Sequence, residues 1–208
     1  MDIYEAMQQR MTIRDFSDKP VDDAVIQKII KAGFLAPTNN HMRDWHFILL
    51  NDREKRAEII GQTMKQVTPK GALGIINRWG LTDPSQRDMY HDAIPKQVSM
   101  LLTSACLLLP CFRQESNVLK PKSLSDLNGF ASIWLCIENL LLAAAAEGVF
   151  GVTRIPFDDE RAQLKTYLSI PAGYEIPCWI ALGYPAENAR RASQVQINVT
   201  DRIHPDSW

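Results

Sequence analysis

The stretch I-W-L-C-I-E-N-L-L-L-A-A-A-A, residues 133–146, is apolar around almost the whole circumference of the helix that it predicts. Glu138 and Asn139 are its only polar interruptions. Such a helix has no polar face to turn toward water, so it must be buried on nearly every side. We therefore place a central helix over residues 127–147.

The central helix also bears on the oligomeric state. The chain has 208 residues, which supply few other elements to surround a helix of this length. A subunit interface would cover the face that the rest of the chain leaves open, and most soluble oligomers are symmetric homo-oligomers. We therefore expect a homodimer whose interface includes this helix.

Helices and strands alternate on both sides of the central helix. Asp2 and Glu5 have the spacing of a capping box and begin a first helix. Asp22 caps a second helix, whose apolar stripe runs to Leu35 and ends at Pro37. Strands are predicted over residues 45–50, 104–112, 149–155 and 176–182. This order predicts an α+β fold, a mixed α/β sandwich in which helices flank a central sheet, and no repeat or linker divides residues 1–208 into more than one domain.

Residues 69–95 interrupt the alternation of helices and strands. They mix Gly, Pro and aromatic residues without a clear period, so we expect an irregular excursion that could cover a site. Trp79, Tyr90 and His91 lie within it and could select a substrate. The alternative is that these aromatic side chains only pack against one another.

Composition and charge exclude several classes of function. Hydrophobic residues make up 46% and charged residues 23% of the chain, which is typical of a globular enzyme rather than a disordered protein. The net charge of -1 argues against a nucleic-acid partner. The apolar stretch 101–112 is too short to cross a bilayer, and the N-terminus is acidic where a secretory signal would be basic. We expect no membrane partner and a cytoplasmic location.

Neither the cysteines nor the histidines have the spacing of a metal site. The cysteines lie in apolar segments without a C-x-x-C pair, at Cys106, Cys111, Cys136 and Cys178. The histidines lack an H-E-x-x-H pattern, at His41, His46, His91 and His204. We expect buried, reduced thiols, no metal and no Ser-His-Asp triad.

Two short segments carry candidate chemistry. Arg10, Thr12 and Arg14 alternate in an extended segment, so they project to the same side. Guanidiniums and a hydroxyl in a row can hold an anion such as phosphate, although two solvated arginines on a connecting segment would give the same pattern. The second segment, A-P-T-N-N-H-M-R-D-W at residues 36–45, combines turn chemistry with the start of a strand.

Together, and in this order, these pieces resemble the FMN-dependent nitroreductase family. R-M-T-I-R-D-F at residues 10–16 is similar to the family's R-[RS]-S-x-R-x-F, and residues 36–45 are similar to its A-P-S-x-x-N-x-Q-P-W. The long apolar helix, the Gly-rich strand and the ending I-P-A-G-Y (170–174) with G-Y-P (183–185) also match. The resemblance spans nearly the whole chain and implies a nitroreductase-like fold in an intertwined homodimer.

The resemblance implies a set of FMN contacts at matching positions of this chain. They are Arg10, Met11, Thr12 and Arg14 for the phosphate, ribityl chain and pyrimidine edge; Pro37, Thr38 and His41 for the FMN of the other subunit; Thr153, Arg154 and Ile155 along the isoalloxazine ring, with a backbone N–H offered to flavin N5; and Arg190 with Arg191 for the phosphate.

The chain departs from the family pattern at four of these positions or next to them. His41 stands where the family has Asn, Arg43 where it has Gln, Asp44 where it has Pro, and Pro156 where many relatives have Gly. We expect Arg43 and Asp44 to form an ion pair at the interface. His41 either contacts the partner's flavin with a titratable ring or closes the turn and points to solvent.

The resemblance also implies a reaction. Hydride from NAD(P)H passes onto FMN and then to a small electron-poor acceptor, a nitroaromatic or a quinone, by a ping-pong mechanism that requires no catalytic side chain. The cation of Arg14 would stabilise the anionic reduced cofactor. Two alternatives stay open: a specialised flavin enzyme of the same family, of dehalogenase or flavin-destructase type, and a non-catalytic dimer that binds flavin or another small molecule.

Overall fold

The computed structural model describes residues 1–192 and 195–208. Its helices and strands are α1 (Ile3–Gln9), α2 (Asp23–Gly33), β1 (Trp45–Leu49), α3 (Arg53–Thr63), α4 (Pro69–Arg78), α5 (Pro84–Ala93), α6 (Ser99–Thr103), β2 (Cys106–Arg113), η1 (Leu124–Leu127), α7 (Asn128–Ala146), β3 (Phe150–Arg154), α8 (Asp158–Tyr167), β4 (Tyr174–Glu175), β5 (Trp179–Gly183) and η2 (Val199–Arg202). The four predicted strands correspond to β1, β2, β3 and β5, and the short strand β4 is additional.

One antiparallel sheet forms the centre of the molecule. Its strand order is β1-β2-β5-β3, and β4 pairs with β2 beside β5. Thr12 forms an isolated parallel bridge with Gly151 of β3, and the Ile13 amide donates to the Gly151 carbonyl over 3.2 Å. The N-terminal segment therefore covers the outer edge of β3.

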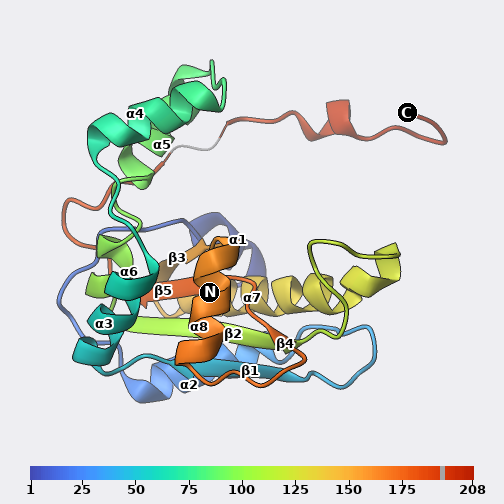
Figure 1. The fold of residues 1–208 in the computed structure, drawn as a ribbon. Coiled ribbons are helices and arrows are strands. Elements are labelled where there is room, and N and C mark those ends of the chain that lie inside the picture. The colour runs from blue at the N-terminus through green and yellow to red at the C-terminus, as the bar shows by residue number, and fades with distance from the viewer. Residues whose placement is uncertain (193–194) are drawn as a thin grey trace.

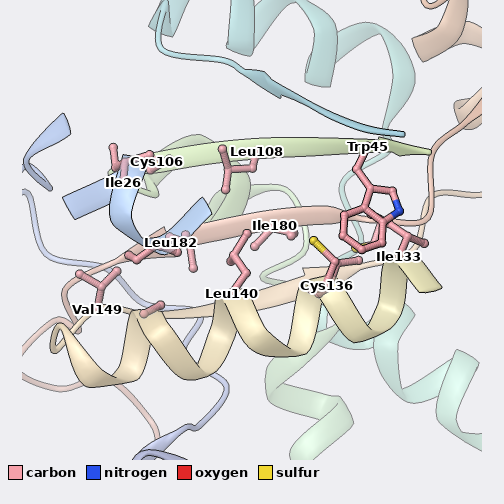
Figure 2. Close-up of a cluster of buried hydrophobic side chains, with 14 of the residues drawn as sticks. Ile26, Trp45, Cys106, Leu108, Ile133, Cys136, Leu140, Val149, Ile180 and Leu182 are labelled. Carbon is pink, nitrogen blue, oxygen red and sulfur yellow. The ribbon is translucent and has the colours of Figure 1, made fainter. Parts of the chain in front are cut away.

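Helices cover both faces of this sheet, with a hydrophobic core on each (Figure 1). On one face α2 and α7 pack against side chains such as Leu108 and Ile180, as Figure 2 shows for the labelled residues. On the other face α3, α6 and α8 pack against side chains such as Leu109 and Trp179. The predicted α+β fold, a mixed α/β sandwich with helices on both sides of a central sheet, is confirmed.

Local sequence explains where the first two helices begin. The Asp2 side chain accepts from the Glu5 amide at 2.9 Å and the Glu5 side chain accepts from the Asp2 amide at 2.9 Å, which completes the predicted capping box. The Asp22 carboxylate accepts from the Ala24 amide at 2.7 Å and begins α2. Leu35 lies beyond the end of α2 with 76% of its surface exposed, so its assignment to the apolar stripe was wrong.

The central helix α7 is buried over only part of its circumference. Cys136 and Leu140 are fully buried between α2 and the sheet, and a Cβ on Gly33 of α2 would stand only 3.0 Å from the Cys136 sulfur. On the opposite side Leu135 is 50% exposed. The predicted burial on every side is therefore not achieved within one chain.

Residues 124–146 are long and apolar enough to cross a membrane. Of the 18-residue stretch that is apolar enough, 39% is buried inside the protein. Residues 124–146 thus form a longer apolar segment than residues 101–112, on which the expectation of no membrane span was based. Its packing on the sheet and on α2 is that of a core helix.

Residues 69–95 are more regular than their sequence suggested. They form the two helices α4 and α5, each with a side-chain cap, from Thr68 and Asp83, followed by Pro at the first turn. A small core of their own includes Ala72, Ile76 and Ile94. Figure 1 shows α4 and α5 standing away from the sheet, as do residues 195–208, which we call the C-terminal arm. The predicted irregular excursion is thus a helical hairpin.

All four cysteines are free and buried. Burial raises the pKa of the Cys106 thiol to about 11 and that of the Cys136 thiol to about 12, so both stay protonated at neutral pH. The prediction that the thiols are buried is confirmed. Among the described residues there is no group of three potential metal-binding side chains.

Candidate functional site

A cavity of about 230 Å³ lies between the N-terminal segment, α7 and the outer strand β3. Its polar side chains are those of Arg10, Thr12, Glu138 and Thr153. The remaining walls come from Met11, Trp134, Ile137, Leu141, Phe150, Gly151 and Val152. The bridge from Thr12 to Gly151 brings together segments that are far apart in the sequence, which is why no local pattern could outline this pocket.

Arg10 is held in the cavity by a weak ion pair. Its Nε lies 3.4 Å from Oε1 of Glu138, and the two side chains are 31% and 53% exposed. Exposed pairs of this kind contribute about 0–1 kcal/mol. Hydrogen bonds to charged groups contribute about 1.5–3 kcal/mol, so an oxyanion that reached Arg10 would outcompete Glu138.

Arg14 belongs to a different environment from Arg10. In extended chain, four residues span about 13 Å, which separates the two guanidiniums. Burial lowers the pKa of Arg14, and Asp92 and Asp15 oppose that shift. Lys96 completes this cluster, with its Nζ 2.7 Å from a carboxylate oxygen of each aspartate. The arginine row is therefore divided between a pocket at Arg10 and a charge cluster that joins Arg14 to α5.

The C-terminal basic pair is also divided. Arg190 pairs with the Asp88 carboxylate of α5 and lies close enough to Arg14 to lower the pKa of that guanidinium. Arg191 is exposed. Helix α5 thus pairs Asp88 with Arg190 and places Asp92 near enough to Arg14 to raise its pKa, and the family resemblance assigns both arginines to FMN.

The three predicted contacts at the end of β3 point in different directions. Thr153 lines the cavity beside Arg10. Arg154 enters the opposite face of the sheet, where its Nη1 lies 2.5 Å from Oε1 of Glu160 and both side chains are almost fully buried. Ile155 is 64% exposed beyond the strand end. The side chain of Arg154 is therefore absent from the lining of this cavity, and only its backbone is near the strand end.

The turn with Pro37, Thr38 and His41 lies against another part of α7. The Asn39 amide donates to the Ser132 hydroxyl over 3.3 Å, and the Thr38 hydroxyl donates to Oδ1 of Asn40 over 3.2 Å. His41 is exposed with φ 59°. Ser132 and Glu138 are separated by about 120° around a regular helix. One chain therefore does not bring this turn into the cavity of Arg10.

Asp44 has partners other than the one predicted. Its Oδ1 accepts from the Tyr174 hydroxyl at 2.6 Å and lies 3.2 Å from Nε2 of His46. The hydrogen bond from Tyr174, aided by His46, lowers the pKa of Asp44. Arg43 is exposed at φ 46° and forms no ion pair within the described part of the chain, so its pair with Asp44 at a subunit interface stays a prediction.

Sequence reasoning missed the acidic residues of the site. Glu138 was noticed only as an interruption of the apolar helix, yet it faces Arg10 across the cavity. A single carboxylate within an apolar helix was the available signal. Asp88 and Asp92 gave no signal, because their partners depend on how α5 docks against the rest of the chain.

The fold and this cavity define an α+β protein of the nitroreductase type. Residues 7–184 match the model of the Nitroreductase family, and the chain belongs to that family. A relative from Methanothermobacter thermautotrophicus, provisionally named an NADH dehydrogenase/NAD(P)H nitroreductase, is 30% identical over 209 residues, covering 100% of this chain and 88% of the relative.

Solved structures share the fold. An iodotyrosine deiodinase bound to FMN and 3-iodo-L-tyrosine matches with a TM-score of 0.74 at 15% identity, covering 100% of both chains. The NADPH:FMN oxidoreductase of Vibrio harveyi, complexed with NAD+, matches with a TM-score of 0.69 at 19% identity, covering 99% of this chain and 77% of the other.

Proposed function

We propose that this protein is an FMN-dependent oxidoreductase that works as a homodimer. When bound, FMN would supply the redox chemistry: hydride from NAD(P)H in one half-reaction, and its transfer to a nitroaromatic or quinone in the other, by a ping-pong mechanism. The observation that carries this proposal is the cavity in which Arg10, Thr12 and Thr153 face an apolar wall of α7. Membership of the Nitroreductase family supports it.

The residues of the cavity suit a flavin mononucleotide. A guanidinium and two hydroxyl-bearing side chains can hold the phosphate and ribityl hydroxyls, while Trp134, Ile137 and Leu141 offer an apolar surface. Arg14 would meet the anionic part of the ring system, and Arg190 would meet the phosphate once it releases Asp88 of α5. Arg191, Met11 and the Ile155 amide are proposed as further contacts.

A second copy of the chain would complete the site. The cavity of about 230 Å³ is smaller than the roughly 300–1,000 Å³ of typical ligand pockets. The turn with Pro37, Thr38 and His41 lies on another face of α7, so we assign it to the FMN of the partner. Apolar surface for such a dimer is exposed on α1, α7 and the C-terminal arm, at Ile3, Tyr4, Met7, Leu135, Val195, Ile197, Val199, Ile203 and Trp208.

Spectroscopy of the purified protein tests the proposal. We expect a flavin absorption spectrum that bleaches when NADH or NADPH is added without oxygen and that returns when a quinone or a nitroaromatic is added. Sedimentation should give a dimer. A protein that takes up no FMN, or a monomer that retains it fully, would contradict the proposal.

The two alternatives give different results in the same experiment. A non-catalytic flavin-binding dimer would keep its spectrum on addition of either nicotinamide. A specialised enzyme of dehalogenase or destructase type would bleach but would reoxidise slowly with quinones and nitroaromatics. The helical hairpin of α4 and α5 is the feature that could confer such selectivity, because α5 contributes Asp92 to the charge cluster at Arg14.

A further inference from the structure

A second cavity, of about 450 Å³, lies on the other face of the sheet, between the helical hairpin and the start of α8. Its volume falls within the range of about 300–1,000 Å³ that is typical of ligand pockets. Its lining consists of Thr63, Met64, Lys65, Val67, Ile75, Arg78, Trp79, Ile94, Gln97, Arg154, Phe157, Asp159 and Glu160. None of these residues except Arg154 belongs to the set proposed for FMN.

Arg154 lines this cavity with part of its hydrogen-bonding capacity unused. Its side chain is only 7% exposed. Nε donates to Oε1 of Gln97 over 3.2 Å and Nη1 donates to Oε1 of Glu160 over 2.5 Å. Within the described residues Nη2 of Arg154 makes no hydrogen bond. It is not fully buried either, so it opens on the cavity that Arg154 lines.

Glu160 does not bond to this remaining edge of the guanidinium within the described residues. Oε1 of Glu160 also accepts from Nε1 of Trp179 over 2.9 Å, and Oε2 accepts from the Phe157 amide over 3.3 Å. The Glu160 carboxylate therefore accepts hydrogen bonds from Nη1 of Arg154, from Trp179 and from the Phe157 amide, and none from Nη2 of Arg154. A buried guanidinium that presents free N–H groups to a cavity matches the geometry of a carboxylate ligand.

The other walls indicate what the rest of such a ligand would be. Trp79 and Phe157 are 54% and 70% exposed, and both line the cavity with aromatic surface that the chain leaves uncovered. The guanidinium carbon of Arg154 lies 5.8 Å from the centroid of the Phe157 ring. A flat aromatic group could therefore occupy the space beside Phe157 while an acidic group reaches Arg154.

The charges around the cavity favour an anion. Cations are contributed by Lys65, Arg78 and Arg154, and carboxylates by Asp159 and Glu160. Within the described part of the chain neither Lys65 nor Arg78 has a carboxylate within 4.0 Å. Three cations against two carboxylates leave one excess positive charge around the cavity.

We propose that this cavity binds a small aromatic carboxylate, whose oxyanion takes the free edge of Arg154 and whose ring lies between Trp79 and Phe157. Lys65 and Arg78 stand at the same cavity and add to the attraction. The site is separate from the FMN pocket, because Thr153 and Arg154 point to opposite faces of β3. Its existence therefore does not depend on the proposed redox function.

Calorimetric titration tests the site without any nicotinamide, so its outcome is independent of flavin reduction. The probes are 2-naphthoate and its neutral counterpart 2-naphthamide. We expect naphthoate to bind and naphthamide to bind about tenfold to a hundredfold more weakly, as the loss of a charged hydrogen bond implies. Equal affinities, or no binding of naphthoate at millimolar concentration, would overturn the proposal.

Variants locate the binding. Arg154→Lys keeps a cation beside Glu160 but removes the planar edge, and we expect it to weaken naphthoate binding about tenfold or more. Arg78→Gln, at an exposed position, should weaken binding severalfold without affecting the fold, whereas the matched control Arg53→Gln on α3 should not change it. If Arg154→Lys does not fold, Arg78→Gln and Trp79→Ala decide the question. Affinities that none of these variants changes would place the ligand elsewhere.

Discussion

Thr153 and Arg154 are neighbours on β3, yet their side chains enter two different environments. Thr153 faces a pocket whose ion pair, between Arg10 and Glu138, is long and largely exposed. Arg154 faces a short, buried ion pair with Glu160. One strand thus separates a charge that can change partners from a charge that the fold has fixed. The Arg10 pair on the first face can open for a ligand, whereas on the second face Arg154 keeps its pair with Glu160 and offers a ligand only its remaining edge.

The largest expected effect comes from the buried pair. Glu160→Ala would leave the guanidinium of Arg154 buried without its counter-charge, which costs about 3–5 kcal/mol. Urea unfolding measures this loss. The matched variant on the exposed face, Glu138→Ala, should change the unfolding free energy by less than about 1 kcal/mol. Similar losses in both variants would remove the contrast between the two faces.

The exposed pair should matter for binding instead. Arg10→Ala is expected to lower FMN affinity by about tenfold to a hundredfold, because it removes a charged hydrogen bond to the phosphate. The unfolding free energy should stay within about 0.5 kcal/mol of the parent value. Fluorescence titration with FMN and urea unfolding provide the two readings. An unchanged flavin affinity would show that Arg10 does not hold the phosphate.

Asp44 and Tyr174 form an intermediate case on the surface of the sheet. The hydrogen bond from Tyr174 lowers the pKa of Asp44 in the folded state, so its stabilisation is present above the ordinary pKa of Asp, about 4, and is lost as the pH falls through the lowered value. Tyr174→Phe should therefore lower the unfolding free energy at neutral pH and leave it unchanged in strong acid.

Unfolding at several pH values, together with an NMR titration of the Asp44 carboxyl, checks this prediction. The matched control is Tyr167→Phe, on an exposed tyrosine without a hydrogen bond among the described residues. A loss of stability by Tyr174→Phe that does not vary with pH would assign the effect to packing against His46 rather than to the carboxylate.

The smallest effect on stability is expected at His41. Asn adopts positive φ readily, so His41→Asn should leave the unfolding free energy within about 0.5 kcal/mol of the parent. If the ring lies beside the partner's flavin, His41→Asn should change the reduction potential of the bound flavin, because it replaces the imidazole with a neutral amide. Superimposable potential curves would leave His41 as a turn residue facing solvent.

Patterns that are local in sequence predicted much of the fold. The central helix, the capping box at Asp2 and the cap at Asp22 depend on residues a few positions apart, and the structure has all three. The helices α4 and α5 carried an equally local signal, a capping residue followed by proline at Thr68–Pro69 and Asp83–Pro84, which the search for hydrophobic period overlooked.

The candidate site depends on information that no local pattern contains. The side of α7 that stays exposed carries Leu135 as well as Glu138, and the sequence alone could not say whether this chain or a second one covers it. The partners of the arginines were equally hidden: Arg10 meets Glu138, and Arg190 meets Asp88, across long stretches of chain. The family resemblance identified the cationic residues. The carboxylates that compete for them could be identified only from the structure.

The bridge between Thr12 and Gly151 has a consequence for biosynthesis. Arg10 and Thr12 leave the ribosome early, but the strand that completes their pocket emerges only after most of the chain has been made. Contacts between such distant segments also form slowly, because a large loop must close first. The pocket can therefore assemble only late in synthesis or after release. Until then Arg10 and Thr12 have no strand β3 beside them and cannot form the pocket.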